Sequence, residues 1–91
     1  MADATTLSIR LGELNSQFVA RSQGKQVLAS ATRFHTVILD FAGVDMVGHS
    51  FIDEVFRVFA TAHPEVRLRT ANVAPQVADM IARFAPHVDQ D

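Results

Sequence analysis

Apolar residues occupy every second position between Thr6 and Leu11, beginning at Leu7. A period of two is typical of a strand with one buried face, so this segment is a predicted strand. The polar and glycine-containing stretch over 12–16 predicts a turn. Whether a further short strand lies around Phe18 is left open by the pattern.

The period then changes to that of a helix. Ser22 is a suitable N-cap, and the pattern predicts a helix from Ser22 to about Arg33. Its apolar positions recur along one face, at Val27, Leu28, Ala31 and Phe34.

The segment over 35–41 is short, apolar and rich in β-branched residues, which predicts a central strand buried on both faces. A helix is predicted from about Phe51 to Ala62, and it should end there because Pro64 disfavours α geometry in the residue before it. Its apolar stripe has two rows, Phe51, Val55, Phe59 and Ile52, Phe56.

Alternation returns over 66–70, where Arg67 and Arg69 give the predicted strand one polar face, as at the edge of a sheet. A last helix is predicted from Pro75 to Phe84, with proline at its first position. The element order β-α-β-α-β-α predicts an α/β fold with at least partly parallel strands, joined by right-handed crossovers into a mixed sheet of three to four strands with helices packed on it. We expect one domain over 1–91, with flexible ends at 1–5 and 86–91.

Composition narrows the classes of function. The hydrophobic fraction is 48% and the charged fraction 20%, which is typical of a globular chain. A net charge of -2 with scattered basic residues argues against nucleic-acid binding. No apolar run reaches about 18 residues, the chain has no cysteine, and its start lacks a leader pattern, so we expect a cytoplasmic protein without a membrane segment.

Ser50 is the first candidate for chemistry. It stands where a strand and loop give way to the helix, so it is interpreted as an N-cap in a capping box with Asp53. The alternative adds phosphorylation, because a helix N-terminus attracts a phosphate, although Asp53 and Glu54 would repel it. Arg57 can pair with Asp53 at i, i+4 and with Glu54 at i, i+3.

Asp40 and Gly43 follow the predicted central strand, where α/β sheets commonly place their sites. A structural role is favoured for Asp40, with its carboxylate accepting from backbone amides of the following turn. No metal site and no cofactor are predicted, because no two of the four histidines have helical ligand spacing and no glycine-rich phosphate loop is present. No nucleophile is paired with a base, so we expect a protein that is not an enzyme.

The block "TVILDFAGVDMVGHSFIDEVFRVF" resembles the STAS-like domain family of unknown function. Supporting pieces are "ARSQGKQVL" and "HPEVRLRTANV", and the resemblance covers most of the chain after Leu14. These are small bacterial proteins or modules, often found with histidine-kinase-type ATP-binding domains. The resemblance implies a small STAS-like sandwich with a regulatory role.

More remotely, the same block is similar to the anti-sigma factor antagonists, which carry Asp-Ser-Ser/Thr-Gly at the start of this helix. That motif falls on 48–51, where only Ser50 keeps its residue type. The similarity implies a protein partner, namely an ATP-binding kinase-like protein, with Ser50 as the phosphoacceptor. The expected partner-binding residues are Asp45, Gly48, His49, Ser50, Asp53, Glu54 and Arg57.

Two further readings stay open. A small ligand or nucleotide could bind at the strand ends near Asp40 and Gly43. Alternatively, an apolar patch containing Phe18, Phe41 and Phe84 could drive a homodimer.

Overall fold

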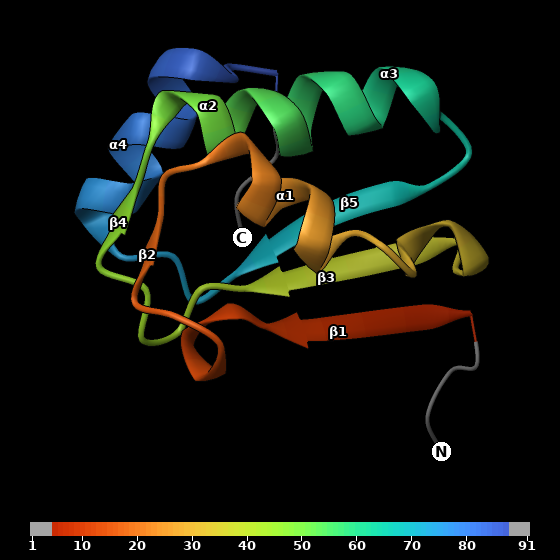
Figure 1. Cartoon of the computed structure of the whole chain (residues 1–91), viewed down its shortest axis with the longest axis horizontal. Coiled ribbons are helices and arrows are strands. Elements are labelled where there is room, and N and C mark those ends of the chain that lie inside the picture. The colour runs from red at the N-terminus through yellow and green to blue at the C-terminus, as the bar shows by residue number, and fades with distance from the viewer. Residues whose placement is uncertain (1–4, 88–91) are drawn as a thin grey trace.

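Two parallel sheets and one layer of helices make up the computed structural model, which describes residues 5–87 (Figure 1). Short 3-10 turns at Leu11–Glu13 and Ala31–Arg33 and a π-helical segment at Glu54–Phe59 complete the regular structure of this part of the chain. The strands and α-helices are, in order, β1 (Thr6–Arg10), β2 (Gln17–Phe18), α1 (Arg21–Val27), β3 (Thr36–Asp40), β4 (Met46–Val47), α2 (His49–Asp53), α3 (Ala60–Ala62), β5 (Arg67–Ala71) and α4 (Pro75–Phe84).

The α/β class and the predicted order of the main elements are confirmed. The larger sheet has the order β1-β3-β5, and the short strand left open around Phe18 exists as β2 and pairs with β4. A mixed sheet was expected, but β1–β3, β3–β5 and β2–β4 all pair in parallel. Long connections through helices permit this direction, which a tight hairpin does not.

The strand β3 has one buried face, and the prediction that both its faces are buried is wrong. Val37 and Leu39 are 0% exposed, whereas Ile38 between them is only half-buried. Figure 1 shows the reason: the helices of the described residues gather on one side of the sheet, and none of them covers its other face.

The first helix starts and ends differently from the prediction. Its N-cap is Ala20, not Ser22, and the side chain of Gln23 accepts from the backbone N–H groups of Val19 and Ala20 at 2.8 and 2.9 Å. The helix ends at Val27 instead of continuing to Arg33, because the chain must turn here to bring Leu28 and Ala31 into the core before β3.

One hydrophobic cluster joins both sheets to the helices. Phe18 and Phe41 are 2% and 1% exposed, so the suggested dimer patch of three phenylalanines does not exist, and only Phe84 is exposed. The helix predicted from about Phe51 to Ala62 is continuous over 49–62, through α2, the π-helical segment and α3, and is called the long helix below. Its predicted apolar stripe is confirmed, since both rows are buried. The helix 75–84 begins and ends as predicted.

Within residues 5–87, no helix is both long enough and apolar enough to cross a membrane. Most of the ends expected to be flexible, residues 1–4 and 88–91, lie outside the described residues.

Candidate functional site

The junction between β4 and α2 is fastened to the end of β2. The N–H of Gly48 donates to the carbonyl of Phe18 at 2.8 Å, and the N–H of Phe51 donates to the carbonyl of Val19 at 3.2 Å. A Cβ on Gly48 would lie 2.9 Å from Cγ1 and 3.1 Å from Cα of Val19. Glycine is therefore needed at position 48 for the close approach of two backbones, and its φ of -107° is ordinary.

Ser50 lies inside the first turn of α2 and is exposed. The N-cap is Gly48, which corrects the prediction that Ser50 caps the helix. The capping box with Asp53 is also absent, because the carboxylate of Asp53 is held by Arg21 and Arg57. The hydroxyl of Ser50 is thus presented to solvent from a rigid helical turn.

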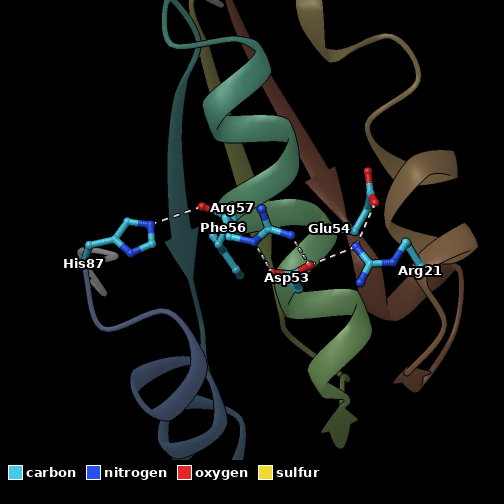
Figure 2. A network of polar contacts seen from close by, with 6 residues as sticks. All are labelled: Arg21, Asp53, Glu54, Phe56, Arg57 and His87. Atoms are coloured by element: carbon cyan, nitrogen blue, oxygen red, sulfur yellow. Dashed lines mark hydrogen bonds and ion pairs between the residues drawn. The ribbon is translucent and has the colours of Figure 1, made fainter.

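An arginine from α1 and an arginine of the π-helical segment share the carboxylate of Asp53 (Figure 2). Nε and Nη2 of Arg57 donate to Oδ1 and Oδ2 of Asp53 at 2.5 and 2.8 Å. Nη1 of Arg21 lies 3.0 Å from Oδ2 of Asp53. The hydrogen bonds from Arg57, and then those from Arg21, lower the pKa of Asp53 to about 2, so this carboxylate is charged at neutral pH.

Glu54 points toward α1 and away from Arg57. Its Oε1 accepts from Nη1 of Arg21 at 3.2 Å, and the residue is only 7% exposed. The predicted ion pair between Glu54 and Arg57 is replaced by this contact, and burial removes Glu54 from the surface on which it was expected. The sequence contains no signal for the role of Arg21, because it lies 33 positions from Glu54.

This network changes the electrostatic setting of Ser50. The two carboxylates predicted to repel a phosphate each contact a guanidinium, so the charge of the four side chains is balanced. The side chain of Arg57 is 66% exposed although it is paired with Asp53. The electrostatic objection to a phosphate on this turn is correspondingly weaker.

Exposed apolar side chains gather at the same junction. Val19, Met46 and Phe84 are 45%, 43% and 40% exposed. Val19 packs on Gly48, Met46 lies in β4, and the ring of Phe84 stacks on His49 with centroids 4.4 Å apart. The expected partner-binding residues did not include these three, because Val19 and Phe84 lie on segments separate from the predicted loop and helix, although Phe84 was expected in an apolar patch.

The remaining expected contact, Asp45, is exposed beside this junction. Its N–H donates to the carbonyl of Ser16 at 2.8 Å, and its carbonyl accepts from Nε2 of Gln76 at 3.3 Å. Its backbone is thus fixed between the turn before β2 and α4, while its side chain faces solvent. At this junction Asp45, His49 and Ser50 are exposed, and Gly48 is half-buried.

The long helix contains a π-helical segment in place of continuous α-helix. Such segments are rare and often occur at functional sites. The carbonyl of Phe56, inside this segment, lies 3.1 Å from Nε2 of His87 (Figure 2). Because a carbonyl can only accept, Nε2 must carry the proton in this contact, which links the segment to the chain after α4.

Asp40 has the structural role that the sequence favoured. Its Oδ1 accepts from Nδ2 of Asn72 and from the N–H of Ala42, both at 3.0 Å. These two bonds, led by that from Asn72, lower the pKa of Asp40. Asn72 adopts a left-handed φ of 56°, which brings its side chain to the carboxylate.

The loop carrying Gly43 packs on the loop after β1. A Cβ on Gly12 would lie 1.9 Å from the carbonyl oxygen of Ala42, and Gly43 has a left-handed φ of 84°. The carboxylate of Asp40 and the glycines near it therefore make contacts within the fold. Ligand binding at this place stays a prediction. Within residues 5–87 no cluster of three or more potential metal-ligating side chains occurs.

Comparisons with known proteins identify the family. The model of the STAS-like domain of unknown function (DUF4325) matches residues 23–78, which is more than half of the chain. No curated protein and no solved structure matches the chain significantly. The matched range contains α1 from Gln23 onward, the central strand, the junction at Ser50 and the charge network except Arg21. The chain therefore belongs to the family of STAS-like domains of unknown function.

Proposed function

We propose that this chain is a non-catalytic regulatory domain that binds a protein partner through the surface around the β4–α2 junction. The partner we propose is an ATP-binding, kinase-like protein that phosphorylates Ser50. Family membership supports a regulatory STAS-like role, and the finer assignment rests on the geometry of the junction.

The observation that carries the proposal is an exposed serine at the end of a segment that bears exposed apolar side chains. Val19, Met46 and Phe84 lie in or against the segment that ends at Ser50. Exposed apolar groups beside polar ones are typical of protein interaction surfaces, where they supply the binding energy. The exposed guanidinium of Arg57 adds a charged contact one helical turn beyond Asp53.

A phosphate on Ser50 would switch this surface through its charge. At neutral pH it adds about -1.5 to -2 charges next to the apolar side chains. Burying that group against a partner costs desolvation energy, and an acidic partner surface would repel it as well. The modified domain should therefore dissociate from its partner.

The test is quantitative affinity capture from source cells in the presence of ATP, followed by mass spectrometry. Ser50→Ala is expected to recover an ATP-binding protein, and wild type to recover less of the same protein because part of it carries phosphate on Ser50 and has dissociated. Ser50→Asp and Met46→Glu should recover that protein at least about tenfold less, which corresponds to about 1.4 kcal/mol of binding energy.

Ser30→Asp is the matched control, because it adds the same charge at an exposed residue before the 3-10 turn at Ala31–Arg33. It should recover the partner as wild type does. Equal recovery with Ser50→Ala and Ser50→Asp would reject the switch. Undiminished recovery with Met46→Glu would reject the junction as the binding surface.

A further inference from the structure

The guanidinium of Arg21 has donors that the charge network does not use. Its ion pairs with Oδ2 of Asp53 at 3.0 Å and with Oε1 of Glu54 at 3.2 Å are both made by one nitrogen, Nη1 (Figure 2). A guanidinium carries five N–H donors on three nitrogens, and within residues 5–87 no acceptor contacts Nε or Nη2 of Arg21. The side chain is 43% exposed, so these donors are open to a further anion.

Ser50 lies on the helix face that Arg21 covers. Residues three and four positions apart are neighbours on a helix, with Cβ atoms about 5–6 Å apart, so Ser50 lies beside both Asp53 and Glu54. At about 100° per residue, Ser50 falls between these two carboxylates around the helix axis. A Cβ on Gly24 of α1 would lie 3.1 Å from Cβ of Glu54, which shows how closely α1 approaches this face. A phosphate on Ser50 is therefore within reach of the guanidinium of Arg21.

Arg57, the other arginine of the network, is less suited to such a phosphate. Its Nε and Nη2 both donate to the carboxylate of Asp53, so its fork of donors is already occupied. It also lies about two helical turns beyond Ser50. Arg21 is thus the arginine whose fork of Nε and Nη2 is unoccupied beside the serine.

We propose that Arg21 binds the phosphate of modified Ser50 and holds it between α1 and the long helix. The inference rests on the modification proposed above, in which Oγ of Ser50 bonds to the γ-phosphorus of ATP, ADP leaves and the hydroxyl proton is released. Nε and Nη2 of Arg21 donate to two phosphate oxygens, which is the paired geometry in which arginine recognises phosphate. Nη1 keeps its contacts with the two carboxylates.

This ion pair has a measurable sign. Phosphoserine loses its second proton with a pKa of about 6. A guanidinium favours the doubly charged phosphate and lowers this pKa, whereas the carboxylates of Asp53 and Glu54 oppose that charge and raise it. The contribution of Arg21 is therefore measured as a difference between chains that share the same two carboxylates.

The test uses the full chain with phosphoserine installed at position 50 by chemical ligation or genetic incorporation, and phosphorus NMR follows the phosphate through a pH titration. The phosphate pKa should be at least about 0.5 pH units higher in Arg21→Gln than with Arg21 present. Arg21→Lys keeps the charge but loses the fork, so its value should lie between the two. Lys25→Gln is the matched control, because it removes the same charge from an exposed residue about one turn further along α1, and it should change the pKa by less than about 0.2 pH units.

A measurement without any variant covers the case in which Arg21→Gln does not fold. In the phosphorylated wild-type chain, the Nε–H signal of Arg21 in a proton–nitrogen NMR spectrum should shift with the same pKa as the phosphate. A signal that does not follow the phosphate titration would overturn the proposal. So would a folded Arg21→Gln with an unchanged phosphate pKa, or a Lys25→Gln change as large as that of Arg21→Gln.

The outcome is separate from that of the capture experiment, because the phosphate is installed without a kinase. Cells that yield no phosphate on Ser50 would reject the proposed modification, whereas the titration decides whether Arg21 binds the phosphate.

Discussion

Gly48 and Ser50 have different roles although they lie two positions apart. Gly48 allows the backbone of Val19 to approach, whereas Ser50 makes no contribution as a cap. Sequence pattern alone joins them into one loop-to-helix motif. Only their surroundings separate a residue needed for packing from one available for modification.

Gly48→Ala is expected to lower the free energy of unfolding by about 1–3 kcal/mol, because the new methyl group meets backbone atoms of Val19. Ser50→Ala, its matched control, should stay within about 0.5 kcal/mol of wild type. Urea denaturation measures both. A loss of about 1 kcal/mol or more in Ser50→Ala would restore the interpretation of Ser50 as a helix cap.

At the scale of elements, Arg21 ties α1 to the long helix. One guanidinium contacts the carboxylates of Asp53 and Glu54, and the latter is nearly buried. A buried carboxylate needs such a partner, because leaving it unpaired is costly. The helix that precedes β3 and the helix that follows it are thus held together by charge as well as by apolar packing.

The paired carboxylate of Asp53 should make the stability of the fold depend on pH. The pKa of Asp53 in the folded protein is about 2, below its ordinary value of 3.8, so its charge stabilises the fold above pH 3.8 and this contribution is lost as the pH falls toward 2. The difference in unfolding midpoint between wild type and Asp53→Asn should therefore be larger near pH 5 than near pH 2.

The control for this pH effect uses Arg57, because its hydrogen bonds are the main cause of the lowered pKa. In an Arg57→Gln background, the shift in unfolding midpoint caused by Asp53→Asn should differ less between pH 5 and pH 2 than it does in the wild-type background. Thermal melts followed by circular dichroism provide the midpoints. A difference that is independent of pH in the wild-type background would contradict the assignment.

At the scale of the whole molecule, the two sheets share one hydrophobic core. Phe18 of β2 packs on Phe51 of α2 with ring centroids 5.1 Å apart, and both belong to the cluster that contains Val37 and Leu39 of β3. A ladder of two residues per strand could not persist alone. The junction that bears Ser50 is therefore positioned by the same core that supports the larger sheet.

Phe18→Ala is expected to cost about 3–5 kcal/mol, a large fraction of the about 5–15 kcal/mol that stabilises a small domain. In native-state hydrogen exchange, Phe18→Ala should lower the free energy of exchange of the Val37 and Leu39 amides. The decrease should equal the decrease in the free energy of global unfolding. If the protection of these amides is unchanged and only the amides of β2 and β4 lose protection, the two sheets unfold separately.

Much of the architecture was readable from local pattern. The α/β class, the alternating element order, the apolar stripe of the long helix and the bounds of α4 follow from periodicity, proline placement and β-branched content, which act within a few residues. The resemblance of the block around Ser50 also led to the correct family. These features depend on neighbours in the chain, so a single sequence carries them.

The tertiary structure alone decided the rest. The sequence predicted some parallel pairing, but not that all three strand pairings are parallel. The open face of β3, the cap at Gly48 in place of Ser50, and the contact of Arg21 with Glu54 also depend on residues far apart in the chain. Ser50 was predicted as a cap because its local sequence fits one, but the approach of Val19 sets where the helix begins. Local pattern determines which elements form, whereas packing between distant segments determines which side chains remain exposed for function.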